Sequence, residues 1–215
     1  MVERGCKYCF MECASHAIVQ RRIYGIDFRG ALFTNLTHDH LDYHKTFAEY
    51  IRAKKSFFDM LDKDSWAVVN SDDRNGEVML QNCKAKGYRL SLPSMADFNT
   101  KIIEMQPNSM LLHINGRELW VKFTGRFNAY NLTAVYATSI LLGWEPEMVL
   151  INMSRLVPVA GRFQAFHSPK GYTAIVDYAH TPDAVVNVLN AIRDVIGNSG
   201  NIITVVGAGG NRDKG

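Results

Sequence analysis

The chain has 215 residues, of which 47% are hydrophobic and 21% are charged, and its formal net charge at pH 7 is +3. This length allows a substantial core in one or two domains. The low charge and the lack of a long basic run argue against a nucleic-acid partner. No long apolar run or signal sequence points to a membrane or to secretion, so we expect a cytoplasmic protein.

Three of the four cysteines lie near the start of the chain with the spacing C-x-x-C-x-x-x-C, which invites a zinc interpretation. Residues 7–11 read as a strand, which would put Cys6 and Cys9 on opposite faces and separate Cys9 from Cys13 by about 13 Å. We therefore interpret these cysteines as structural thiols in a reducing compartment.

The first predicted strand ends at Glu12. A carboxylate at the end of a buried strand is unfavourable unless it is paired or holds a metal, and ligands of open α/β sheets bind just outside the carboxyl ends of the strands. The donors Gln20, Arg21 and Arg22 follow and suit an anionic substrate. A solvated turn explains the two arginines equally well.

Residues 31–34 form a second apolar, strand-like run, and the loop that follows is rich in groups that can bind a metal. These groups are His38, Asp39, His40, Asp42 and His44. Thr46 and Glu49 then form an S/T-x-x-E capping box, which predicts a helix with Thr46 as its N-cap.

Apolar residues fall at helical spacing along this predicted helix. They are Phe47, Tyr50, Ile51, Phe57, Phe58 and Leu61. Lys54 lies in the middle of the stripe, whereas Lys55 points away from it. A lysine there either extends to solvent or loses hydration, which lowers its pKa and leaves a nucleophilic amine that can react with carbon dioxide to give a carbamate. From the pattern alone, extension to solvent is the better interpretation.

The middle of the chain has a strand–helix–strand rhythm, with strands at 66–70 and 88–92 separated by the turn 71–73 and a helix of about a dozen residues. This rhythm is typical of a mainly parallel sheet. From residue 100 the pattern changes to antiparallel strands, predicted at 101–105, 110–114 and 118–123. Asn115-Gly116 is a type I′ hairpin signal, so we expect a small β appendage on the same domain.

Two helices come next, the first capped by Asn128 and running to Gly143, and the second beginning at Pro146. Residues 157–161 resemble a linker. We place the domain boundary there, giving a first domain of residues 1–157 and a second of residues 158–215.

The second domain begins its regular structure with a strand at 173–176, followed by Asp177-Tyr178-Ala179-His180. Thr181-Pro182 predicts a helix to Gly197, and a final strand is expected at 202–206. The glycine-rich loop 207–215 is a weak candidate for phosphate binding, because it does not fit G-x-G-x-x-G. No stretch fits the phosphate loop G-x-x-x-x-G-K-[ST].

Several interpretations of the His/Asp loop remain open from the residues alone. A dinuclear metallohydrolase would use H-x-H-x-D-H, but Tyr43 stands where the last histidine is required. A phosphoryl- or acyl-transfer site would use Glu12 and one loop histidine to hold magnesium. A polar loop without metal, or an interaction module without catalysis, is also compatible with the pattern.

Six strings resemble the Mur ligases, and most closely their MurE type, the UDP-N-acetylmuramoyl-tripeptide synthetases. They are MECASHAIVQRR, FTNLTHDHLDYHKTFAEYIRAKKSFF, GRFNAYNLTA, VAGRFQAF, VDYAHTPDAVVNVL and GAGGNRDKG. Cyanophycin and folylpolyglutamate synthetases fit less well. The resemblance implies an α/β central domain, with a mainly parallel sheet flanked by helices and a small antiparallel appendage. The start of a Rossmann-like C-terminal domain would follow.

The resemblance also implies an ATP-dependent amide ligase of peptidoglycan precursor synthesis. Such a ligase phosphorylates the D-glutamate side chain of UDP-MurNAc-L-Ala-D-Glu, and the amine of meso-diaminopimelate or L-lysine attacks the acyl phosphate. The implied cofactors are ATP as co-substrate, Mg²⁺ and a carbamylated lysine. The implied partners are the two substrates, with the enzyme acting as a monomer.

The family's site residues can be carried onto matching positions. Glu12 and His40 match the magnesium ligands, and Lys54 matches the lysine that becomes carbamylated and places magnesium, so Lys54 and His40 are the implied catalytic residues. The segment that contacts the UDP-sugar substrate supplies Ser15, Gln20 and Arg22.

Four further positions match nucleotide contacts of the family. Asn131 matches an asparagine beside the adenine, and Arg162 an arginine that reaches the ATP phosphates. Asp177 and His180 match nucleotide contacts between the domains.

The chain departs from the family pattern in three ways. Ala14 replaces a serine that contacts substrate. The G-T-N-G-K-T-T loop and the N-terminal UDP-binding domain are missing, and the chain ends partway through the C-terminal domain. We therefore expect a fragment in which Met1 is an internal methionine, and we expect residues 1–215 alone to be inactive.

Overall fold

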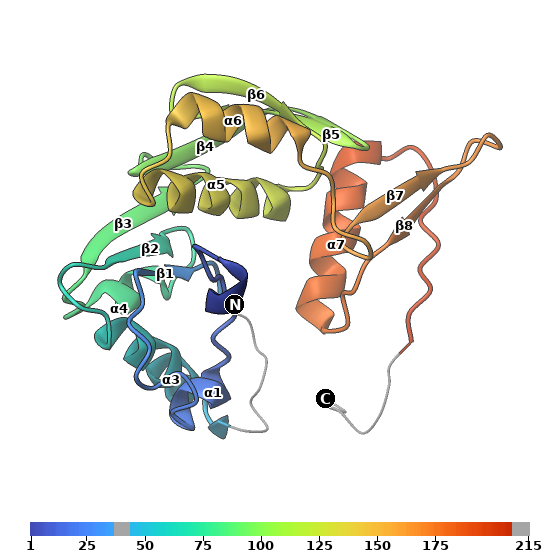
Figure 1. The fold of residues 1–215 in the computed structure, drawn as a ribbon. Coiled ribbons are helices and arrows are strands. Elements are labelled where there is room, and N and C mark those ends of the chain that lie inside the picture. Colours follow the sequence, from blue (N-terminus) through green and yellow to red (C-terminus); the bar gives the residue numbers. More distant parts are fainter. Residues whose placement is uncertain (37–43, 208–215) are drawn as a thin grey trace.

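The computed structural model describes residues 1–36 and 44–207 (Figure 1). Its main feature is a six-stranded sheet in which the strands are neighbours in sequence order. The strands are β1 (Gly30–Phe33), β2 (Trp66–Asn70), β3 (Lys86–Ser91), β4 (Phe98–Gln106), β5 (Ser109–Ile114) and β6 (Arg117–Val121).

The sheet changes from parallel to antiparallel at β4. Strands β1 to β4 are parallel neighbours, with Leu90 opposite Phe98 between β3 and β4, whereas β4, β5 and β6 are antiparallel. Asn115 and Gly116 both have positive φ, 44° and 89°, as the predicted type I′ turn requires. The mainly parallel α/β fold class is confirmed, and the antiparallel part continues the same sheet through β4.

Helices lie on both sides of this sheet (Figure 1). One side carries α5 (Arg126–Leu141) and α6 (Pro146–Arg155); the other carries α1 (Ser15–Val19), α3 (Phe47–Asp59) and α4 (Gly76–Leu80). Successive side chains of β2 point to opposite faces of the sheet, so the strand contributes to the core on both sides. Val68 packs with the α5 side and Val69 with the α3 side, and both are fully buried.

Local sequence signals place several helix ends correctly. Thr46 accepts a hydrogen bond from the Glu49 backbone N–H at 3.2 Å, so α3 begins as predicted. Pro146 is the first residue of α6. Thr181 accepts from the Ala184 N–H at 3.3 Å and caps α7 (Pro182–Ile196).

Asn128 is not the N-cap that the sequence predicts. Helix α5 begins at Arg126, three residues earlier than a cap at Asn128 predicts, because Gly125 takes the cap position with a φ of 91°. The Asn128 side chain lies inside the first turn and donates to the Thr124 carbonyl at 2.8 Å. The predicted helix before β3 is also shorter than expected, since α4 has only five residues.

Two predicted strands do not form. Residues 7–11 follow a short 3₁₀ turn, η1 (Val2–Arg4), and run without strand pairing, with 73% of Phe10 exposed. Residues 202–206 are likewise unpaired, and Ile203 is 89% exposed. Apolar alternation suits a strand, but a strand also needs a partner edge, which the local pattern does not supply.

The second part of the chain holds an antiparallel pair, β7 (Gln164–His167) and β8 (Thr173–Val176), followed by α7. The space beside Gly125 at the start of α5 is filled by the buried Ala191 of α7. The predicted strand at 173–176 and the helix after it are therefore confirmed. The domain boundary after residue 157 stays a prediction.

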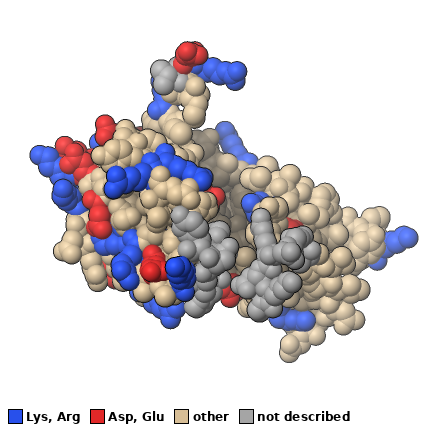
Figure 2. All heavy atoms as spheres, turned by 90° about the horizontal axis from the view of Figure 1, so that it is seen from below, with Lys and Arg blue, Asp and Glu red and all other residues tan. Residues whose placement is uncertain are grey.

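Basic and acidic side chains both occur on the surface of the described part of the chain. On the face shown in Figure 2, basic and acidic side chains are interspersed, as a net charge of +3 suggests. Across the part of the chain that the structure describes, no helix has the length and apolar character needed to cross a bilayer.

Candidate functional site

Lys54 turns toward the protein rather than extending to solvent. Its Nζ donates a hydrogen bond to the backbone carbonyl of Cys13 at 3.1 Å. Burial lowers the pKa of Lys54, and the nearby charges of Glu12 and Cys13 oppose this effect without reversing it. Helix α3 thus presents a partly dehydrated amine, whose neutral, nucleophilic form is favoured relative to an exposed lysine.

Glu12 has an exposed side chain, and its negative charge acts on the Lys54 amine. Mg²⁺ takes oxygen ligands, keeps several waters and needs only one or two carboxylates together with phosphates, so Glu12 next to Lys54 fits this ion. Within residues 1–36 and 44–207, no group of three or more His, Cys, Asp or Glu side chains is arranged to hold a metal.

Most of the predicted His/Asp loop is not among the residues that the structure describes. His38, Asp39, His40 and Asp42 lie outside the described residues. The role of His40 as a magnesium ligand therefore stays a prediction, and so does the alternative of a dinuclear metallohydrolase.

His44, the last residue of that loop, is buried and shares a hydrogen bond of 2.7 Å between its Nε2 and the Oγ of Ser15. Its ring stacks on Tyr50 of α3, with ring centres 5.3 Å apart and an angle of 18° between the planes. Ser15 is itself fully buried. The predicted contact of Ser15 with a UDP-sugar is not tested by this arrangement and stays a prediction.

Gln20 and Arg22 lie just after α1, and both side chains are exposed. Helix α1 ends there because Gln20 takes the C-cap position and Arg21 adopts a positive φ of 57°. The side chains of Gln20 and Arg22 therefore lie at the surface. They belong to the same segment of the chain as Glu12 and Ser15.

The β7–β8 pair brings together three predicted nucleotide contacts: Arg162, Asp177 and His180. The Arg162 guanidinium lies 4.7 Å from the centre of the Tyr178 ring, and that ring contacts the His180 ring at 5.2 Å. The Asp177 carboxylate accepts from the backbone N–H groups of Phe163 and Ala179, at 2.7 Å each.

Asn131, the fourth predicted nucleotide contact, is exposed on α5. Phe127, one helical turn earlier on the same face, contacts the Phe163 ring with centres 5.5 Å apart. The first turns of α5 therefore lie next to the segment that carries Arg162. The structure thus forms two groups of predicted site residues, one around α1 and α3 and one around the β7–β8 pair.

A polar network at the ends of β2 and β3 was missed by sequence reasoning, which read residues 71–73 only as a turn. Asp72 accepts hydrogen bonds from the Ser91 hydroxyl at 2.7 Å, the Leu92 N–H at 2.9 Å and the Tyr130 hydroxyl at 2.8 Å. Burial, with the bond to Asp72, raises the pKa of Tyr130. An aspartate two residues beyond the end of a buried strand was the available signal.

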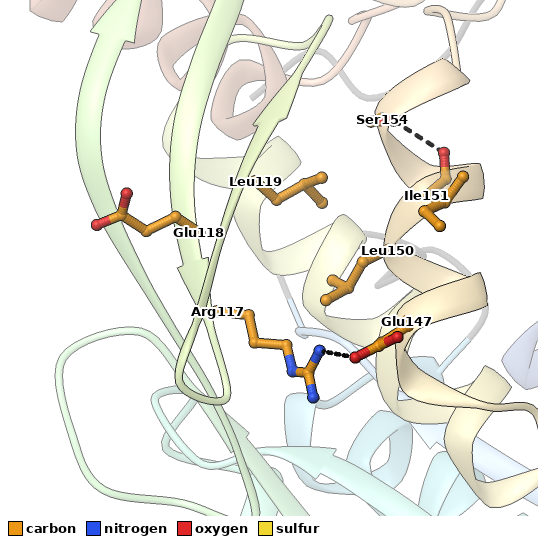
Figure 3. Close-up of a pocket in the computed structure, with 7 residues that line it drawn as sticks. All are labelled: Arg117, Glu118, Leu119, Glu147, Leu150, Ile151 and Ser154. Carbon is orange, nitrogen blue, oxygen red and sulfur yellow. Dashed lines mark hydrogen bonds and ion pairs between the residues drawn. The ribbon is translucent and has the colours of Figure 1, made fainter.

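Residues of β6 and α6 line a shallow surface groove (Figure 3). Leu119 and Leu150 point into it, Glu118 points away, and an ion pair of 2.7 Å joins Arg117 to Glu147 at one end. Exposed ion pairs of this kind contribute little stability. None of the sequence-predicted site residues comes from β6 or α6, so we assign no function to this groove.

The fold defines a protein of the α/β class, and its site carries a partly buried lysine on a helix that flanks the sheet. Residues 1–139 match the Mur ligase middle domain, and residues 161–215 match the Mur ligase glutamate ligase domain. The chain belongs to the Mur ligase family.

Named relatives match the whole chain. It is 59% identical over 215 residues to the UDP-N-acetylmuramoyl-L-alanyl-D-glutamate–2,6-diaminopimelate ligase of Bacteroides fragilis, and 60% identical over 215 residues to the ligase of the same name from Phocaeicola vulgatus. In both cases the match covers 100% of this chain and 44% of the relative. The chain therefore spans less than half the length of these relatives.

A solved structure of a ligase with the same name shares the fold. It superposes with a TM-score of 0.74 at 28% sequence identity, and the match covers 91% of this chain and 42% of that one. The resemblance to MurE-type ligases that the sequence strings indicated is confirmed.

Proposed function

We propose that this chain is part of an ATP-dependent ligase that joins 2,6-diaminopimelate to UDP-N-acetylmuramoyl-L-alanyl-D-glutamate in peptidoglycan precursor synthesis. The observation that carries the proposal is the identity of 59–60%, over all 215 residues, to two ligases named for this reaction. The electrostatic influence of Glu12 on Lys54 supports it, because a phosphoryl-transfer site needs to hold a metal next to an anionic substrate.

In this proposal Glu12, His40 and Lys54 would hold Mg²⁺, and the charge of the ion would stabilise the phosphate oxygens of the transferred group. Reaction of the Lys54 amine with carbon dioxide forms a nitrogen–carbon bond, releases one proton and gives a carbamate. The carbamate would offer oxygen atoms, which Mg²⁺ prefers to nitrogen. The lowered pKa of Lys54 supports this step, since only the neutral amine reacts.

The nucleotide is proposed to lie at the start of α5, between that helix and the β7–β8 pair. Asn131 would contact the adenine and Arg162 the phosphates, with Asp177 and His180 close to the nucleotide. The contact between Phe127 and Phe163 supports this arrangement, because it brings the helix of Asn131 close to the segment of Arg162. The substrate carboxylates and phosphates would meet Gln20 and Arg22, whose donors suit anions.

The reaction is proposed to take place in the cytoplasm, where ATP and nucleotide-activated sugars are found, and the enzyme is proposed to act as a monomer. Light scattering on the purified protein measures the mass directly, and a stable dimer would contradict the monomer.

The proposal is tested by assaying residues 1–215 beside a version extended on both sides to the length of its relatives. With UDP-N-acetylmuramoyl-L-alanyl-D-glutamate and ATP, the extended protein should form product and ADP with meso-2,6-diaminopimelate and much less with L-lysine. The 215-residue chain should form none, because it contains no phosphate loop. An extended protein that instead elongates folates with glutamate would show that the alternative ligase class is correct.

A further inference from the structure

The segment from Cys13 to Ser15 is held to α3 at two points. Lys54 Nζ binds the Cys13 carbonyl at 3.1 Å, and Ser15 Oγ binds His44 Nε2 at 2.7 Å. His44 in turn stacks on Tyr50. Tyr50 and Lys54 are four residues apart and therefore lie on the same face of α3, so two successive turns of one helix fix the segment.

The Ser15–His44 contact is almost completely shielded from solvent. Ser15 is 0% exposed, His44 5% and Tyr50 6%. A polar group buried to this degree needs its hydrogen-bond partner, because neither group can be solvated by water when the bond breaks. The contact therefore resists opening more strongly than a hydrogen bond on the surface.

Helix α1 does not hold this segment by itself. It has only five residues, and Ala14 at its N-cap position makes no side-chain capping bond. An alanine at this position leaves the first N–H groups of the helix without a side-chain acceptor. The anchor for residues 12–15 comes instead from α3 and from His44.

We propose that Ser15 and His44 are positioning residues, whose buried hydrogen bond holds residues 12–15 against α3 and so keeps the Glu12 carboxylate beside Lys54. This inference rests on the proposed function in one respect, the metal that Glu12 would hold there. In this inference Ser15 positions the site without contacting the metal, and the role of His44 is separate from metal binding.

The first test measures backbone opening without any metal or substrate. Hydrogen–deuterium exchange of the 215-residue chain should be roughly tenfold faster at residues 13–16 in Ser15→Ala and in His44→Phe, which keeps a ring for Tyr50 but loses the nitrogen. Ser56→Ala is the matched control, because the Ser56 hydroxyl donates a hydrogen bond within its own helix, to Ala53 O at 2.8 Å. His44→Gln, which keeps a polar group, should recover part of the protection.

The second test uses the extended protein. Ser15→Ala and His44→Phe should raise the Mg²⁺ concentration for half-maximal rate, and the Kd for Mn²⁺ measured by electron paramagnetic resonance, by roughly fivefold to tenfold. The KM for 2,6-diaminopimelate should change less than about twofold, and the double variant should be no worse than the more affected single variant.

Three results separate the possibilities. Unchanged exchange at residues 13–16 would overturn the positioning role. Faster exchange with an unchanged Mg²⁺ requirement would also overturn it, because the contact would then serve stability alone. An extended wild-type protein without ligase activity would contradict the proposed function, while the exchange and Mn²⁺ measurements would still decide the role of Ser15 and His44.

Discussion

The amine of Lys54 and the backbone carbonyl of Cys13 are joined by a 3.1 Å hydrogen bond between residues 41 positions apart. This bond lies next to the exposed carboxylate of Glu12 and keeps the lysine turned inward. Its consequence is chemical, because partial burial lowers the pKa of the amine and so favours its neutral form relative to an exposed lysine.

Lys54→Ala should reduce the rate of the extended ligase by roughly 100-fold or more, since it removes a group that places the metal. Lys55→Ala is the control, because Lys55 forms an ion pair with Asp59 on the same helix. Nuclear magnetic resonance with ¹³C-labelled bicarbonate should show a carbamate carbon in the wild type that disappears in Lys54→Ala. Full activity of Lys54→Ala, together with no effect of bicarbonate, would exclude the carbamate.

Tyr130→Phe should destabilise the chain by about 1 kcal/mol near neutral pH, because it removes the 2.8 Å bond to Asp72 in a partly exposed setting. The pKa of Tyr130 is raised in the folded state, so its contribution is fully present below the ordinary tyrosine pKa of 10.0. Above that value the unfolded chain loses the proton first, and the advantage of the wild type over Tyr130→Phe should shrink as pH rises.

Urea unfolding of both Tyr130 proteins at about pH 8 and about pH 11 measures this change directly, since the other tyrosines cancel in the comparison. If the difference in unfolding free energy between wild type and Tyr130→Phe grew with pH, the predicted direction of the pH dependence would be wrong.

Asp177→Ala should destabilise the chain by about 1–3 kcal/mol, because the N–H groups of Phe163 and Ala179 both lose their acceptor and Phe163 is buried. Asp177→Asn keeps one acceptor oxygen and should recover part of the stability that Asp177→Ala loses. Asp194→Ala, at an exposed position of α7, should stay within about 0.5 kcal/mol of the wild type in the same unfolding measurement. Equal losses for Asp177→Ala and Asp194→Ala would mean that the two bonds contribute nothing.

Ala14→Ser should stabilise the chain by about 0.5–1 kcal/mol. Ala14 already has the extended conformation of an N-cap, with φ −63° and ψ 144°, and lacks only a side-chain acceptor. Ala17→Ser, inside the same helix, should be slightly destabilising because serine has the lower helix propensity. Thermal unfolding compares the two variants, and a lower Tm for Ala14→Ser than for the wild type would refute the capping effect.

Local signals predicted the ends of several elements because each signal acts within about four residues. The Thr46–Glu49 capping box, Pro146 and Thr181 all start helices where expected, and Asn115-Gly116 forms its turn. The strands predicted at 7–11 and 202–206 failed, because strand formation depends on a partner edge elsewhere in the chain. The same reason explains why β4 joins the parallel and the antiparallel strands in one sheet, rather than starting a separate appendage.

The sequence by itself determined the family, the mainly parallel α/β class and the place of Lys54 within an apolar helical stripe. These features follow from the order of the residues and from the helical period, both of which are properties of the sequence alone. Only the tertiary structure decided what Lys54 and its neighbours touch. The bonds from Lys54 to Cys13, from His44 to Ser15 and from Tyr130 to Asp72 join residues 41, 29 and 58 positions apart. Such contacts exist only after the sheet and its helices have packed, because local periodicity fixes the face on which a side chain lies and packing chooses its partner.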